Sequence, residues 1–222
     1  VFFTNPHEGL QDYRYYINQF ANTLTCYVPY SISTFHHKFT YDLNFHNLVW
    51  NFFTETPIHK EIASEKQRNK GKNCTVTGYP GFDPLLINKY PKEVWKNKNP
   101  ALKKIIWTPH HLMNELSKVS NFLEYYDFFL EIAIKYKDKL QIAFNPHPLL
   151  RVKLENDPNW GKEKTDAYYN KWVNLENGQF GNGYYIDLFL TSDALIHDSG
   201  SFMAEYLITG KPLLYMIRNE SI

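Results

Sequence analysis

A turn of small residues, Asp198-Ser199-Gly200-Ser201, separates an apolar run from a helical run near the end of the chain. A turn of this kind exposes unpaired backbone N–H groups at the positive end of the helix dipole. Such a helix end binds phosphate readily. We therefore expect Asp198, Ser199, Gly200 and Ser201 to hold a diphosphate. The alternative is an ordinary capped helix, since Ser and Asp favour cap positions for structural reasons alone.

Glu205 lies four residues after Ser201. That is one position too far for a reciprocal capping pair with a Ser cap at residue 201, so the carboxylate needs another partner. A ribose fits, because a carboxylate can accept hydrogen bonds from both of its adjacent hydroxyls. We expect Glu205 to bind the ribose of the same ligand.

His147 stands between two prolines, in Asn145-Pro146-His147-Pro148, directly after the apolar run 140–144. The prolines restrict the backbone and fix the direction of the imidazole. Because open α/β folds bind ligands at the carboxyl ends of their strands, we expect His147 to stabilise phosphate or to move a proton. The alternative is a plain surface histidine.

Two further pairs of histidines occur in the chain. His110 and His111 follow another strand-like run, and one of them could bind the transferred phosphate or its acceptor; packing against neighbouring aromatic rings is the alternative. His36 and His37 are adjacent, so their side chains point in different directions, and no ligand follows at helical spacing. We therefore do not expect a zinc site there.

Alternating patterns predict the elements that position these residues. Strands are expected at 105–107, 140–144, 194–197 and 212–217, with helices at 122–136, 164–175 and 202–208. This alternation predicts a parallel sheet with helices on both faces. Upstream the pattern is looser, with strands expected at 1–4, 24–28, 49–53 and 75–77 and helices at 10–22 and 57–69.

The stretch Tyr90–Pro100 is rich in Lys, Asn and Pro, which is typical of a linker. We place the domain boundary near residue 95, with residues 1–95 as part of a first domain and residues 96–222 as a second. The chain opens without Met inside a strand-like run, so we expect a piece of a longer protein with an incomplete first domain. Contact of Lys92, Trp95, Lys96 and Lys98 with lipid headgroups is a weaker alternative to a solvated linker.

Composition excludes several classes of protein. The net charge is +1, with 24 Lys plus Arg against 23 Asp plus Glu, so a nucleic-acid partner has little electrostatic support. Cys26 and Cys74 are far apart, which suits buried thiols in a reducing cytoplasm. No apolar run is long enough to span a membrane, and the first residues lack the pattern of a signal peptide.

Three segments together resemble the CDP-glycerol glycerophosphotransferase family of teichoic-acid and capsule polymerases. They are Trp107-Thr108-Pro109-His110-His111, Asn145-Pro146-His147-Pro148, and residues 192–201 with Gly210-Lys211-Pro212. The resemblance covers about residues 100–218 well and the upstream part loosely. It implies an α/β fold of the GT-B type, with two facing Rossmann-like domains and parallel sheets.

The resemblance also implies a reaction. Glycerol phosphate, or a related polyol phosphate, would pass from a CDP-linked donor to a hydroxyl of a lipid-linked polymer, at the cytoplasmic, inner face of the cell membrane. His147 matches the histidine of the family's Lys-Pro-His-Pro motif. Residues 199–201 match its donor-phosphate segment, and Glu205 matches a ribose-binding carboxylate of related enzymes. Helix-end amides and a protonated His147 would stabilise the phosphate charge without a metal or other cofactor.

Two departures from the family pattern stand out. Asn145 replaces the motif's Lys, which removes a positive charge from the expected phosphate site. The Trp-His-Gly motif of the first domain is absent from residues 27–31, so either another group, for example His36 or His37, takes the acceptor's proton or the acceptor chemistry differs. Two other functions remain open, a GT-B glycosyltransferase that uses a nucleotide sugar and a non-catalytic nucleotide-binding fragment.

Overall fold

The computed structural model describes residues 1–10, 12–113, 119–181 and 185–217. The chain divides into two compact units, Val1–Asp83 and Pro84–Ile222, which we call the N-terminal unit and the C-terminal unit. Each unit contains one parallel β-sheet. The predicted α/β class with parallel sheets is therefore confirmed.

The N-terminal unit is built on four parallel strands in the order β1-β2-β3-β4. Their bounds are Phe2–Phe3, Cys26–Tyr27, Asn51–Thr54 and Cys74–Val76. The helices are α1 (Lys38–Tyr41), α2 (Asn44–Leu48), α3 (Pro57–Lys66) and α4 (Asp83–Ile87), the last of which crosses into the C-terminal unit. Aromatic rings fill much of the core, among them Phe3, Tyr27, Phe45 and Phe52.

The helix expected at 10–22 is wrong. Short 3₁₀ helices occupy Glu8–Leu10, Tyr13–Tyr15 and Ile17–Phe20, while Gln11 lies outside the described residues. The Asp12 side chain accepts the Arg14 backbone N–H at 3.0 Å and also pairs with the Arg14 guanidinium. A short side chain that bonds to nearby backbone in this way competes with helix formation. A fourth 3₁₀ helix spans Pro80–Phe82.

The C-terminal unit is built on five parallel strands in the order β7-β6-β5-β8-β9. Their bounds are Gly178–Phe180, Leu140–Phe144, Lys103–Thr108, Ala194–His197 and Leu213–Tyr215. The chain adds β6 and β7 on one side of β5 and then crosses back to add β8 and β9 on the other. The order reverses next to β5, and such a reversal leaves a crevice at the carboxyl ends of the strands.

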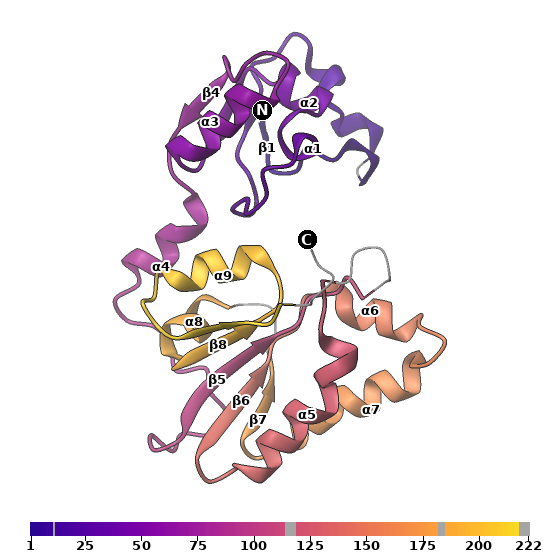
Figure 1. The fold of residues 1–222 in the computed structure, drawn as a ribbon, viewed down its shortest axis with the longest axis vertical. Helices are drawn as coiled ribbons and strands as arrows, with labels where there is room; N and C mark the ends of the chain where they lie inside the picture. The colour runs from indigo at the N-terminus through magenta and orange to yellow at the C-terminus, as the bar shows by residue number, and fades with distance from the viewer. Residues whose placement is uncertain (11, 114–118, 182–184, 218–222) are drawn as a thin grey trace. The chain divides into compact units, whose positions relative to one another are not determined.

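Helices cover both faces of this sheet (Figure 1). α5 (Phe122–Lys135), α6 (Leu149–Glu155) and α7 (Gly161–Asn174) share a core with Trp107, Ile142 and Phe144. α8 (Ile186–Thr191) and α9 (Gly200–Leu207) pack on the opposite face against Ile106, Ala143 and Leu195. Residues of one strand thus alternate between two apolar layers, as a sheet buried on both faces requires.

The segment expected to be a linker belongs to the C-terminal unit. Trp95 is fully buried, and its indole N–H donates to the Thr191 hydroxyl at 2.9 Å. The Lys92 backbone N–H donates to Asp187, and the Lys96 ammonium donates to the carbonyls of Val173 and Leu175. The division between Asp83 and Pro84 therefore lies before the boundary expected near residue 95, because packing holds this polar stretch on the second sheet.

The longest described helices, α5 and α7, have 14 residues each. A helix needs about 20 apolar residues to cross a bilayer. Within the described ranges, no helix combines the length and the apolar character that crossing a membrane requires.

Candidate functional site

The predicted histidines and the phosphate-binding turn lie in the C-terminal unit, at the carboxyl ends of β5, β6 and β8, and Glu205 lies further along α9. His110 and His111 are on the loop after β5, His147 is on the loop after β6, and Ser199 follows β8. These strands are neighbours, in the order β6-β5-β8, beside the reversal of strand order. The fold thus places motifs from distant parts of the sequence at one edge of one sheet.

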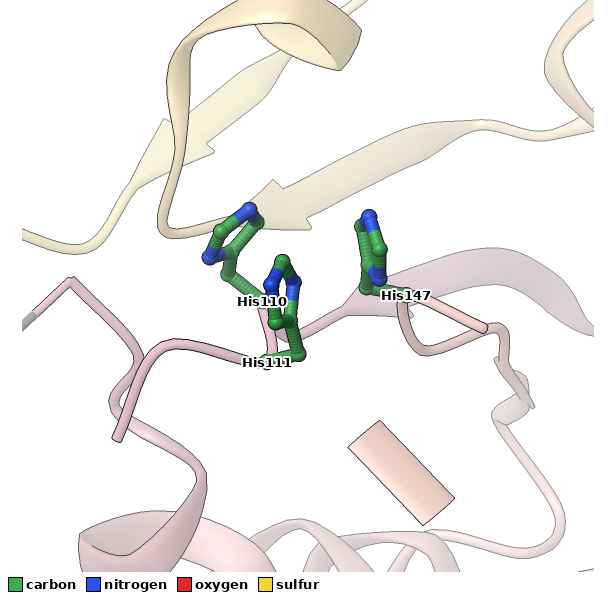
Figure 2. A group of neighbouring side chains, drawn as sticks. All are labelled: His110, His111 and His147. Carbon is green, nitrogen blue, oxygen red and sulfur yellow. The ribbon is translucent and has the colours of Figure 1, made fainter. Parts of the chain in front are cut away.

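Three half-buried imidazole rings form a cluster there, which we call the histidine cluster: His110, His111 and His147. Figure 2 shows the rings side by side, pointing to the same side of their loops. The His111 ring centroid lies 4.0 Å from that of His147 and 4.3 Å from that of His110. One nitrogen from each ring lies within 4.8 Å of the others.

Backbone hydrogen bonds hold the two loops of the cluster together. The His147 N–H donates to the Pro109 carbonyl at 3.0 Å. The His110 ring accepts the Leu112 N–H at Nδ1, at 3.2 Å, and the His147 ring accepts the Leu149 N–H at Nδ1, at 3.1 Å. The bond from the Leu149 N–H, together with the flanking prolines, fixes the direction of the His147 ring, as expected from the sequence.

The histidine cluster is uncharged at neutral pH. Burial, together with repulsion from the neighbouring histidines, lowers the pKa of His110 to about 3 and that of His147 to about 4. Burial, followed by the charge of Lys153, also lowers the pKa of His111. Desolvation therefore disfavours the imidazolium of His147 in the unliganded protein, whereas the resemblance implied a protonated His147 during the reaction.

The start of α9 carries no side-chain cap. Ser199, not Ser201, occupies the cap position, and its side chain makes no capping hydrogen bond. The Ser199 hydroxyl is instead 2.9 Å from Nε2 of His197. Gly200 and Ser201 open the helix, so their N–H groups have no partner within it. An ordinary capped helix, the alternative considered above, is not what the structure contains.

His197 is a buried residue that the sequence reasoning missed. Its Nδ1 atom contacts the backbone carbonyl and the hydroxyl of Thr108, at 2.5 and 2.6 Å. Burial lowers its pKa to about 4. His197 directly precedes the small-residue turn, at the end of a strand paired with β5, and that position was the available signal. It orients the Ser199 hydroxyl away from α9.

Asp198 is buried, and both oxygens of its carboxylate accept backbone N–H groups. Oδ1 accepts from His110 at 2.7 Å, and Oδ2 accepts from Asn121 at 2.8 Å, next to the start of α5. Burial raises the pKa of Asp198 to about 6, against the opposing effect of the two amides. The carboxylate joins three loops around the site, and its own hydrogen bonds stay within the protein.

Glu205 is 2% exposed, and its Oε2 atom accepts the hydroxyl of Tyr185 at 2.6 Å. Burial raises the pKa of the carboxyl group. The expectation that Glu205 needs a partner other than a cap is consistent with this geometry, and the partner in the structure is a tyrosine. Tyr185 precedes α8, where the sequence pattern gave no sign of its role.

Asn145, which stands where the family pattern has Lys, is 5% exposed. Its side chain packs against Gly181, where an added Cβ would clash with the Asn145 amide. A side chain at position 145 thus points to the loop after β7. His36 and His37 lie elsewhere, on an exposed stretch before α1 in the N-terminal unit, with ring centroids 6.0 Å apart.

The arrangement offers an anion two kinds of donor. The first backbone N–H groups of α9 lie two residues beyond Asp198, which accepts a hydrogen bond from the loop that carries His110. Among the described residues, the ring hydrogen bonds of His110 and His147 are made at Nδ1, which leaves Nε2 of each ring to donate to a ligand. Preorganised N–H donors of this kind stabilise charge that develops on phosphoryl oxygens.

Comparison with known proteins adds a family and a fold. A model of the family described as CDP-Glycerol:Poly(glycerophosphate) glycerophosphotransferase matches residues 30–220. No curated protein sequence matches the chain.

Several solved structures resemble the chain. UDP-GlcNAc 2-epimerase from Neisseria meningitidis, bound to UDP-GlcNAc, is 17% identical with a TM-score of 0.55, over 90% of this chain and 54% of that one. The wall teichoic acid polymerase TagF is 17% identical with a TM-score of 0.56, over 87% and 50%. S. aureus MnaA with UDP is 16% identical with a TM-score of 0.55, over 88% and 51%.

At these identities the likeness shows the fold, which is that of the GT-B enzymes. The chain spans about half the length of the structures it matches.

Proposed function

Since the chain belongs to the CDP-glycerol:poly(glycerophosphate) glycerophosphotransferase family, we propose that it transfers glycerol phosphate, or a related polyol phosphate, from a CDP-linked donor to a hydroxyl of a cell-surface polymer. One observation supports this most directly. The uncapped start of α9 and the histidine cluster lie on neighbouring strand ends, joined through Asp198. That combination suits a diphosphate.

In the proposed complex, the N–H groups of residues 200–202 bind the donor's diphosphate. His110 and His147 donate from the opposite side, with His111 between them. The acceptor oxygen forms a bond to the phosphorus that bears the polyol, the bond from that phosphorus to CMP breaks, and the acceptor's proton passes to a base. The N–H donors stabilise the charge that grows on the phosphoryl oxygens.

The base belongs to the acceptor side of the reaction. His36 or His37 takes this role in the proposal, in place of the absent Trp-His-Gly histidine. Replacing each with Ala in the full-length protein tests the assignment. Loss of turnover with an unchanged donor Kd supports it, while unchanged turnover in both variants excludes it.

Glu205 binds the donor ribose in this proposal. One of its oxygens already accepts the Tyr185 hydroxyl, so the ribose and Tyr185 share the carboxylate. Asp198 acts as a positioning residue, since both of its oxygens are bonded to backbone amides.

The acceptor is a lipid-linked wall or capsule polymer, reached from the inner face of the cell membrane. The family description, which names a poly(glycerophosphate), supports a polymeric acceptor. Sedimentation of the full-length protein with anionic vesicles tests membrane binding. Equal recovery in the supernatant with and without vesicles contradicts it.

The reaction itself is tested with radiolabelled CDP-glycerol and, in parallel, UDP-sugars. Label from CDP-glycerol in the polymer is the expected result. Label from a UDP-sugar alone favours the rival, a GT-B glycosyltransferase, for which the fold shared with a UDP-GlcNAc-bound epimerase is the supporting observation. Calorimetric binding of CDP without any turnover favours a nucleotide-binding fragment.

Substitution of His147 tests the catalytic assignment. His147→Ala is expected to lower turnover by about 100-fold, the order of effect of a positioned proton donor. Turnover within a few-fold of the unsubstituted protein removes His147 from the mechanism.

A further inference from the structure

Two rings of the histidine cluster are fixed in one tautomer by backbone amides. Nδ1 of His110 accepts the Leu112 N–H, and Nδ1 of His147 accepts the Leu149 N–H. A nitrogen that accepts an N–H carries no proton itself. In a neutral imidazole the proton then sits on the other nitrogen, so both rings present Nε2–H as a donor.

Charging either ring would place a proton on Nδ1, against an N–H that already points at it. Burial acts in the same direction and lowers the pKa of both rings. The titratable groups around the rings are His111 between them, His197 and Asp198 behind His110, and Lys153 on α6. Among the described cations, Lys153 affects the cluster, and it acts on His111.

The same tautomer argues against a metal ion in the cluster. The spacing of the nitrogens, within 4.8 Å, is near what a divalent ion needs after small ring movements. A metal needs a lone pair, however, and Nε2 of these rings carries a proton. Coordination through Nδ1 would break the hydrogen bonds to Leu112 and Leu149. The rings are arranged to donate rather than to ligate.

We infer that His110 and His147 bind the donor's diphosphate as neutral Nε2–H donors, and that the site therefore prefers phosphates with one negative charge each to a terminal phosphate with two. The inference rests on the proposed function. Neutral donors satisfy an anion's hydrogen bonds, but they supply no full positive charge to offset the cost of removing a second negative charge from water.

This preference separates the donor from its products. In a CDP-linked polyol each phosphate has one ester bond and shares the bridging anhydride oxygen with the other, so each carries one negative charge. The CMP that leaves has a terminal phosphate whose second ionisation lies near pH 6, as in other phosphate monoesters. Transfer thus converts a ligand that the site prefers into one that it holds less tightly, and product release is favoured.

The tautomer is tested directly by NMR of the full chain labelled with ¹⁵N-histidine. Long-range ¹H–¹⁵N spectra distinguish a protonated from an unprotonated ring nitrogen. His110→Gln and His147→Gln assign the two signals, and His7→Gln, at an exposed position, is the matched control. We expect Nδ1 unprotonated and Nε2 protonated in both rings at neutral pH. An imidazolium, or a proton on Nδ1, overturns the inference and leaves the proposed function intact.

The charge preference is tested by calorimetry with CDP-glycerol and CDP between about pH 5.5 and about pH 7.5. We expect the Kd of CDP-glycerol to stay within about twofold and that of CDP to rise about 25-fold, because the monoanion of a phosphate with a pKa near 6 falls from about 76% to about 3% of the total over this pH range. Tighter CDP binding at high pH overturns the inference. The inference is also overturned if the Kd values of CDP-glycerol and CDP rise together with pH, since loss of charge from an imidazolium would weaken the binding of both ligands.

A pair of variants separates a neutral donor from a charged one. Gln places an uncharged N–H₂ near the position of Nε2, whereas Ala places nothing there. His147→Gln should retain CDP-glycerol affinity within about threefold and His147→Ala should lose about tenfold or more, the value of one buried hydrogen bond. Equal losses contradict a neutral donor.

Failure of the proposed function gives a different result. If UDP-GlcNAc binds and CDP-glycerol does not, the glycerophosphotransferase proposal fails. The pair UDP-GlcNAc and UDP then tests the charge preference by the same pH criterion. If no nucleotide diphosphate binds at any pH, both conclusions are wrong.

Discussion

The carboxylate of Asp198 accepts the backbone N–H of His110 at 2.7 Å, and this bond ties the turn that opens α9 to the loop that carries two of the clustered histidines. The other carboxylate oxygen accepts the Asn121 N–H at 2.8 Å, at the start of α5. One buried side chain thus sets the relative positions of three segments. We propose that Asp198 acts on the site through these two hydrogen bonds, as a positioning residue.

Replacing Asp198 with Asn tests this positioning role. The Asn amide can accept one of the two N–H groups, but its own N–H₂ then faces the other. We expect a loss of about 1 to 3 kcal/mol in the free energy of unfolding, the cost of an unsatisfied buried donor. Turnover should fall with it, and urea unfolding and donor turnover measure the two effects.

The matched control for Asp198→Asn is Asp138→Asn, which removes a charge at an exposed position. A merely structural role would lower stability and leave the kinetics of the folded fraction unchanged. A positioning role lowers kcat in protein that is fully folded at the assay temperature. We do not expect Asp198→Glu to restore kcat. The extra methylene group moves the carboxylate, so that its two oxygens no longer lie opposite the N–H groups of His110 and Asn121.

Acid should destabilise the C-terminal unit. The folded-state pKa of His197 is about 4, below the ordinary value of 6.5, so the unfolded chain binds more protons between these values. Stability is therefore full above about pH 6.5 and falls as pH drops toward 4, by up to about 3 kcal/mol for a fully titrated buried group. His110 and His147 act in the same direction.

Asp198 acts in the opposite direction, since its folded-state pKa of about 6 lies above the ordinary 3.8. Its contribution is full below pH 3.8 and is lost as pH rises through 6. Acidification from pH 7 to pH 5 costs more stability through the three histidines than it gains through Asp198. We therefore expect a lower Tm at pH 5 than at pH 7. His147→Gln should reduce this difference and His7→Gln should not; a Tm that rises on acidification contradicts the charge states assigned to the cluster.

Much of the C-terminal unit could be predicted from the sequence. The strands at 140–144 and 194–197 have the predicted bounds, and β5 and α5 differ from theirs by one or two residues. These elements have a clear period and bury a continuous apolar face, so local pattern and tertiary structure agree. The histidines could be placed at strand ends for the same reason.

The parts that failed depend on contacts between distant residues. Trp95 lies in a polar stretch that reads as a linker, and only its bond to Thr191, 96 positions away, reveals that it is packed. The orientation of His197 depends on its pairing with Thr108 on β5. The charge of His147 depends on burial. No local pattern in the sequence carries these three facts.

Packing of Trp95 predicts that residues 84–100 stabilise the second sheet. Trp95→Ala should cost about 3 to 5 kcal/mol in the free energy of unfolding, as expected for a large side chain removed from a core. The control is Tyr90→Ala, at a residue that is 89% exposed, with an expected change of about 0.5 kcal/mol or less. Equal, small changes in both variants would indicate a linker after all.

Ribose recognition by Glu205 predicts a change in discrimination between sugars. The unsubstituted protein should bind CDP-glycerol more tightly than its 2′-deoxy analogue. Glu205→Gln should weaken binding of the first and bring the two affinities together, because a neutral amide is a weaker acceptor than a carboxylate. Calorimetry with both ligands measures the effect.

Tyr185→Phe is the companion variant for Glu205. It removes the hydroxyl that occupies Oε2 and leaves the ring in place. The 2′-hydroxyl preference should persist or increase in this variant. If Glu205→Gln keeps the full preference for the ribose form, the carboxylate serves only to hold Tyr185.

The hydroxyl of Ser199 turns toward His197 and leaves α9 to begin without a side-chain cap. A side-chain cap at position 199 would stabilise the protein by about 1 kcal/mol. The same cap would occupy the N–H groups that the proposed ligand needs, so stability and ligand binding favour different side chains at this position. Selection for heat resistance alone would be expected to favour Ser199→Asp, whose carboxylate imitates a phosphate from within the chain. Such a protein would melt later and would inhibit itself.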